Sequence, residues 1–78
     1  MLKPGQSRAA RGLMDWSQQA LADAAGVGIS TVRDFEKGRR IPHPANLSAI
    51  RAALESAGIE FIEENGGGPG VRLRKAGP

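Results

Sequence analysis

The stretch from residue 17 to residue 38, SQQALADAAGVGISTVRDFEKG, decides the fold of this chain. It predicts a helix over 18–25, because the serine before it is a favoured N-cap residue. Gly26 then supplies the left-handed residue that ends many helices. A second helix is predicted over 29–37, and Gly38 provides the next stop. The stretch therefore predicts two short helices joined by a tight turn that contains glycine.

The two predicted helices carry apolar side chains on facing sides and small side chains where they approach each other. We expect a small core that fixes the angle between them, formed by Leu21, Ala24, Val27, Val32 and Phe35. Short alanine side chains in the first helix let the second helix come close. This is the arrangement of a helix-turn-helix unit.

Two further helices are predicted, one on each side of this unit. The first covers 7–14, and its apolar stripe consists of Ala9, Ala10 and Leu13. The other begins at Pro44, because proline suits the first position of a helix, and it runs to residue 57. Its apolar stripe consists of Leu47, Ile50, Leu54 and Ala57. The pattern predicts a mainly α domain of four to five helices over 1–58.

The pattern changes after the last predicted helix. Within residues 59–64, Ile59 and Phe61 fall on one face of an extended chain and Glu60 on the other, and residues 71–73 alternate again, which predicts two strands. The glycine-rich segment 65–70 between them is typical of a turn. We therefore predict a β-hairpin over 59–73, followed by a flexible basic tail over 74–78. A lone hairpin is only marginally stable in water, so it must pack on the helices or pair across a dimer.

Composition and charge restrict the class of protein. The chain has no cysteine, which excludes disulfide scaffolds, thiolate zinc sites and cysteine nucleophiles. Apolar runs reach at most three or four residues, and no signal peptide is recognised, so we expect a cytoplasmic protein without membrane segments. The net charge is +3 over 1–40, −3 over 41–64 and +3 over 65–78. With a pI near 10.2, this balance fits the charge pattern of a nucleic-acid binder. The alternative is that a net charge of +3 only keeps the protein soluble.

Enzymatic chemistry is not expected from this sequence. His43 is the only histidine and lies between two prolines, with no carboxylate cluster that would complete a metal site. The glycine run 66–70 lacks the GK[ST] continuation of a phosphate-binding loop. Glu63 and Glu64 are adjacent on a predicted strand, so they point to opposite faces. We therefore predict no enzyme, no cofactor and no metal.

The chain resembles the helix-turn-helix domain of phage-type repressors, the Xre/Cro/C1 family, over residues 7–58. The motifs that carry the resemblance are Ser17-Gln18, Leu21-Ala22, Ala25-Gly26-Val27, Ser30-Thr31-Val32, Phe35-Glu36-Lys37-Gly38 and the following Arg39-Arg40-Ile41-Pro42. The hairpin lies outside the part common to the family and is similar to an extension found in a bacterial subgroup. The resemblance implies a lambda-repressor-like fold and a DNA-binding transcription regulator.

The exposed face of the second helix of the unit follows from helix geometry alone. Successive residues turn by about 100°, which places Val32 and Phe35 together on one side. Ser30 falls on the opposite side, and Arg33 and Asp34 flank it. An ordinary solvated face is the alternative interpretation of these charged residues.

The resemblance implies that this face enters the major groove of DNA. The residues that match the family's base-contacting positions are Ile29, Ser30, Arg33 and Asp34. Arg33 is suited to donate two hydrogen bonds to guanine O6 and N7, and Asp34 to accept one from cytosine N4. Two alternatives stay open: Ile29 packs in the core, or Asp34 orients Arg33 instead of reading a base.

Phosphate contacts position such a domain on DNA. Gln18 matches the phosphate-clamping glutamine of the family, at a helix N-terminus whose free N–H groups favour anions. The other residues that we expect to contact phosphates are Gln19, Thr31, Arg39, Arg40 and Arg8. Arg11 and Glu36 match a pair that, in this family, joins the helix predicted over 7–14 to the end of the helix predicted over 29–37. We therefore expect a structural ion pair.

We therefore expect a homodimeric repressor that reads a near-palindromic operator in double-stranded DNA. Two copies would place their reading helices in successive major grooves, about 34–36 Å apart. The hairpin over 59–73 is the expected dimerisation element, because its strands have edges that are free to pair. The alternative is a protein-binding module, such as an antitoxin that clamps a toxin and binds DNA secondarily.

Overall fold

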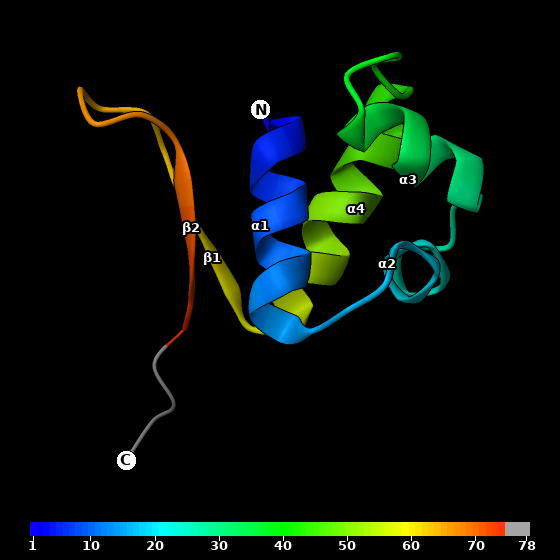
Figure 1. The fold of residues 1–78 in the computed structure, drawn as a ribbon, viewed down its shortest axis with the longest axis horizontal. Helices are drawn as coiled ribbons and strands as arrows, with labels where there is room; N and C mark the ends of the chain where they lie inside the picture. Colours follow the sequence, from blue (N-terminus) through cyan, green and yellow to red (C-terminus); the bar gives the residue numbers. More distant parts are fainter. Residues whose placement is uncertain (75–78) are drawn as a thin grey trace.

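The computed structural model describes residues 1–74, which form four helices followed by an antiparallel hairpin (Figure 1). The elements are α1 (Pro4–Met14), α2 (Gln18–Ala25), α3 (Ile29–Glu36), α4 (Pro44–Ser56), β1 (Ile59–Ile62) and β2 (Gly70–Leu73). The prediction of a mainly α domain with a C-terminal hairpin is confirmed. Of the helices in this part of the chain, none has the length and apolar character that a membrane crossing requires.

Helix α1 begins three residues earlier than the sequence predicts. Pro4 occupies its first position, where the missing N–H of proline would have no helical partner in any case. The Gln6 side chain accepts a hydrogen bond from the Lys3 main-chain N–H at 3.0 Å and so caps the helix. The predicted start at Ser7 is therefore wrong, because Pro4 belongs to the first turn of the helix instead of preceding it.

The turn between α2 and α3 has the chemistry that the sequence predicts. The Ser17 hydroxyl oxygen accepts a hydrogen bond from the Ala20 N–H at 3.0 Å, which caps α2. Gly26 ends α2 in the left-handed conformation with φ 70°, and Gly38 follows α3 with φ 73°. Helix α3 ends at Glu36, one residue earlier than predicted.

The core lies between the helices and beneath the hairpin. Its buried apolar residues are Leu2, Ala10, Leu21, Ala22, Val32, Phe35, Leu47, Ile50, Leu54 and Ile59. Four predicted core positions are wrong, because the side chains are exposed: Ala9, Leu13, Ala24 and Ala57. In α1 the buried residues include Gln6 and Ser7, whose hydrogen bonds offset the cost of burying polar groups.

The hairpin packs face-on against the helices, with β2 beside α1 and β1 beside α4. Its register pairs Ile59 with Leu73 and Phe61 with Val71. Paired residues share a face, and Ile59, which is 1% exposed, places this face in the core. The hairpin lies on the opposite side of the helical body from α2 and α3 (Figure 1).

Arg74 extends the hairpin, although the sequence predicts a flexible tail from this residue onward. Its main-chain N–H donates to the Gly58 carbonyl at 2.6 Å. Its guanidinium donates to the Glu55 carbonyl at 2.7 Å. Arg74 is therefore held by the end of α4, and the rest of the predicted tail, 75–78, lies outside the described residues.

Candidate nucleic-acid interface

The exposed face of α3 carries most of the residues that the sequence predicts for base contacts. Ser30 and Arg33 are exposed, and Asp34 is half-buried beside them. Because these positions are three and four residues apart, they share one face of the helix. Ile29 is half-buried and packs against the core, so it lies at the margin of this face.

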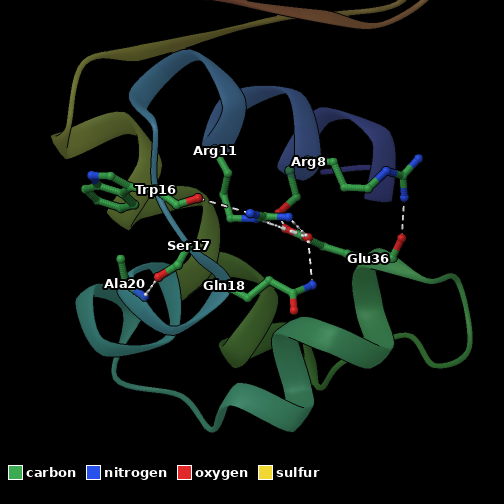
Figure 2. Close-up of polar contacts among 8 residues, drawn as sticks. Arg8, Arg11, Trp16, Ser17, Gln18, Ala20 and Glu36 are labelled. Carbon is green, nitrogen blue, oxygen red and sulfur yellow. Dashed lines mark hydrogen bonds and ion pairs between the residues drawn. The ribbon is translucent and has the colours of Figure 1, made fainter.

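The last residue of α3, Glu36, is a buried carboxylate that joins α3 to α1 and α2 (Figure 2). Its side chain is 1% exposed and pairs with Arg11 of α1, with 2.7 Å between Nη2 and Oε1. Ser7, also in α1, donates its hydroxyl to Oε2 at 2.5 Å. Gln18 of α2 donates its side-chain amide to Oε1 at 3.2 Å. These contacts satisfy the buried charge and fix the end of α3.

Arg11 also binds the segment that leads into α2. Its Nε donates to both carboxylate oxygens of Glu36, at 3.1 and 3.0 Å. Its Nη1 donates to the Trp16 carbonyl at 3.0 Å. One guanidinium therefore connects α1, the end of α3 and the approach to α2.

The acidity of both partners reflects this environment. Burial by itself raises the pKa of Glu36, but the hydrogen bonds from Arg11, Ser7 and Gln18 and the charge of Arg11 lower that pKa by more. The hydrogen bond to Glu36 raises the pKa of Arg11. Both groups stay charged at neutral pH, and the pair acts as a structural element.

Four of the six residues predicted for phosphate contact lie at two places around α3. Gln18 and Gln19 open α2, while Arg39 and Arg40 follow α3 and are exposed. The Gln18 side chain is engaged with Glu36 as described above, and the Gln19 amide donates to an Asp23 carboxylate oxygen at 2.8 Å. One pair therefore lies in the helix that precedes α3, and the other pair lies in the loop that follows it.

Two other phosphate candidates have different surroundings. Thr31 is half-buried on α3. Arg8 is exposed, but its guanidinium donates to the main-chain carbonyl of Glu36 (Figure 2). The Arg8 guanidinium therefore lies at the end of α3 that Arg39 and Arg40 follow, where it is bound to the main chain.

Two residues with clear roles are not predicted from the sequence. Ser7 binds Glu36, and the signal that could have found it is its spacing of four residues from Arg11 on one helix face. His43 caps α4, because its Nδ1 accepts the Ala45 N–H at 3.1 Å. Within residues 1–74, no group of three histidine, cysteine, aspartate or glutamate side chains is placed to hold a metal ion.

The comparisons with known proteins agree with this geometry. A family model described as helix-turn-helix matches residues 8–61. The matched range includes α1 from Arg8 onward, the whole of α2, α3 and α4, and β1 up to Phe61, which is more than half of the chain. No curated protein matches the chain.

Proposed function

The chain belongs to the helix-turn-helix family of the Cro/C1 type, whose members are DNA-binding transcription regulators, and from this premise we propose how it recognises DNA. We infer a homodimeric repressor that binds a near-palindromic operator through α3. The observation that supports this best is the exposed polar face of α3, on a helix whose C-terminal end is held by the buried Glu36.

Arg33 is the main base-reading residue in this proposal. It is exposed, and its guanidinium can donate two parallel hydrogen bonds to guanine O6 and N7. Ser30, one turn earlier on the same face, bonds to a neighbouring base. Asp34 accepts from cytosine N4 or orients Arg33, and Ile29 contacts a thymine methyl group from the margin of the face.

Phosphate contacts on both sides of α3 set its register in the groove. The N-terminus of α2 offers free main-chain N–H groups beside Gln18 and Gln19. The Gln18 amide has two N–H donors, of which one goes to Glu36 and the other is free for a phosphate. The further proposed phosphate contacts are Thr31, Arg39 and Arg40.

The proposed dimer contact is the free edge of β2. The Arg74 N–H points towards the β1 side of the hairpin. Since this direction alternates along an antiparallel strand, the main-chain groups of Val71 and Leu73 point away from β1. A second copy can pair with this edge about a two-fold axis at Arg72, with Val71 of each copy opposite Leu73 of the other. The Arg72 charge is offset by Glu60 at 3.0 Å.

This pairing suits DNA binding because of where its axis lies. A two-fold axis between antiparallel neighbours in one sheet is perpendicular to that sheet. Both helical bodies then lie on the same side of a four-stranded sheet. Since α3 is on the side of the body away from the hairpin (Figure 1), both α3 helices face the same way and can approach one duplex.

An uncharged strip on α1 lies next to this edge. Helix α1 and β2 run side by side in the same direction (Figure 1), and Gln6 donates to the Gly70 carbonyl at 3.1 Å. Leu13 lies two turns after Gln6 on the same side of α1, about level with Leu73. Leu13 is 45% exposed and Leu73 is 49% exposed. The other exposed residues of this strip are small: Gly5, Ala9 and Gly12. Such a strip allows the two α1 helices to approach closely.

We expect the double variant Leu13→Glu with Leu73→Glu to be monomeric, because it places carboxylates of both copies against each other at the contact. Neither residue belongs to the core, so the stability of the monomer should change by only about 0.5 kcal/mol. Sedimentation equilibrium measures the oligomeric state. The matched control is Ile41→Glu, at a residue that is 78% exposed in the loop after α3 and should leave the dimer intact. A double variant that stays dimeric, or a monomeric wild-type protein, contradicts the hairpin contact.

Selection of bound duplexes from a random DNA library tests the proposed function directly. We expect enriched sequences with two-fold symmetry and half-sites about one helical turn, 34–36 Å, apart. An enriched motif without symmetry would contradict the dimer but keep base reading by α3. Absence of enrichment would contradict a sequence-reading repressor. It would favour the alternative function, binding of a protein partner such as a toxin. The large apolar residues exposed for such a partner are Met1, Leu13, Ile41 and Leu73.

A further inference from the structure

We propose that Arg8 is a positioning residue that fixes the angle at which α3 meets DNA, and that it does not bind a phosphate. This inference rests on the proposed function, because it concerns how the same helix reads bases. Arg8 is predicted from the sequence to be a phosphate contact. Its guanidinium is directed instead at the C-terminal end of α3 (Figure 2).

The carbonyl groups at the end of α3 show what Arg8 contributes. A helix leaves its last four carbonyls without partners inside the helix unless the following turn satisfies them. Here Lys37, Gly38 and Arg39 donate their N–H groups to the carbonyls of Arg33, Phe35 and Asp34, at 3.1, 3.0 and 2.9 Å. The fourth carbonyl belongs to Glu36, and its donor is the Arg8 guanidinium. Arg8 therefore completes the C-terminal cap of the recognition helix with a positive charge where the helix dipole is negative.

Three residues of α1 contact Glu36, but the three contacts restrain different parts of it. Ser7 and Arg11 bind the carboxylate, at the end of a side chain with several rotatable bonds. Arg8 binds the main chain of Glu36. Of these three contacts, that of Arg8 acts most directly on the axis of α3.

The consequence for DNA reading follows from the length of the helix. Helix α3 has eight residues, so it is about 12 Å long. Arg33 lies about one turn before Glu36, close to the end that Arg8 holds. A change in the tilt of this end moves Arg33, and also Arg39 and Arg40, which follow the helix. Hydrogen bonds to base edges depend steeply on geometry, whereas the attraction between the arginine charges and the phosphates tolerates such a shift. Loss of Arg8 should therefore reduce base preference and leave the electrostatic attraction unchanged.

The test compares Arg8→Ala with Arg40→Ala in the full chain. Dissociation constants are measured for the selected operator and for an unrelated duplex over a range of salt concentrations. The preference is the dissociation constant for the unrelated duplex divided by that for the operator. For Arg8→Ala we expect this ratio to fall about tenfold, with an unchanged slope of log affinity against log salt. For Arg40→Ala we expect an unchanged ratio and a slope smaller by about one unit. If Arg8→Ala instead shows the Arg40→Ala result, Arg8 is a phosphate contact and the proposal is wrong.

Circular dichroism at the assay temperature separates positioning from loss of the fold. Simple destabilisation lowers the fraction of folded protein and weakens binding to both duplexes equally. An unchanged ratio of the two dissociation constants would therefore also overturn the proposal. If Arg8→Ala does not fold, Arg8→Lys replaces it, since lysine keeps the charge without the planar guanidinium. For Arg8→Lys we then expect a ratio of dissociation constants below that of the wild-type protein, with the same salt slope. A ratio equal to that of the wild-type protein would contradict the proposal. The wild-type ratio tests the proposed function by itself, because a ratio of one means that no sequence is preferred.

Discussion

Arg11→Ala is expected to lower the free energy of unfolding by about 3 kcal/mol, because it leaves the Glu36 carboxylate buried without a counter-charge. We place the loss at the lower end of the range for buried pairs, since the Arg11 side chain is 20% exposed. A chain of 78 residues has a total stability of roughly 4–12 kcal/mol. The midpoint of thermal unfolding should therefore fall by roughly 10–25 °C.

The matched control for this variant is Arg72→Ala, with both changes made in the monomeric Leu13→Glu with Leu73→Glu variant, because Arg72 lies on the proposed two-fold axis. This change also removes a guanidinium from an ion pair, here with Glu60 at 3.0 Å, but both side chains of that pair are exposed. Exposed pairs contribute about 0–1 kcal/mol, so this change should be small. Denaturant unfolding of both variants makes the comparison. A loss in Arg11→Ala no larger than that in Arg72→Ala would show that Glu36 does not depend on its partner.

The same pair makes stability depend on pH in a defined direction. The pKa of Glu36 is lower in the folded chain than its ordinary value of 4.5. As the pH falls below 4.5, the unfolded carboxylate takes up its proton first, while the folded one stays ionised. The contribution of Glu36 to the free energy of unfolding is therefore complete above the ordinary pKa and is lost as the pH falls through the pKa of the folded chain. Glu36→Gln should lack this part of the acid dependence.

Arg33→Ala is expected to relax the preference at one base position of the operator and to cost about 1–3 kcal/mol of binding free energy. The reason is that Arg33 is the exposed residue on α3 whose guanidinium can bond to two acceptors of one guanine. Repeating the duplex selection with the variant identifies the position, and a titration with the wild-type operator measures the loss.

The control for base reading is an arginine of similar exposure outside the helix. Arg40 follows α3 and is exposed, so Arg40→Ala should weaken binding to all sequences alike. The selected motif should then be the same as that of the wild-type protein. If Arg33→Ala and Arg40→Ala change the motif equally, the assignment of one residue to bases and the other to phosphates is wrong.

Local chemical signals explain why α2 and α3 are predicted to within one residue. Ser17 and Gly26 mark the ends of α2, and Gly38 marks the end of α3, through conformations set by their own side chains or by the lack of one. The hairpin is predicted for a similar reason, because the placement of Ile59 and Phe61 on one face and Glu60 on the other is a local pattern. Such features need no knowledge of distant partners.

The inward face of α1 is predicted poorly, because its partners are far away in the sequence. Ser7 and Arg8 bind Glu36, which is 29 and 28 residues further along the chain. Apolar periodicity points to Ala9 and Leu13, yet both are exposed. A polar residue is buried where a specific partner satisfies it, and that partner appears only when the helices are packed. The base-contacting and phosphate-contacting assignments stay predictions that depend on DNA-binding measurements.

The contact between α1 and β2 also bears on the order of folding events. The hydrogen bond from Gln6 to Gly70 joins positions 64 residues apart, whereas α2 and α3 are neighbours in the chain. Closing a long loop costs more chain entropy than closing a short one, so contacts between distant segments form late. We therefore expect α2 and α3 to form contacts with each other before the hairpin docks on α1, so that the helix proposed to read DNA is in place before the edge proposed for dimerisation.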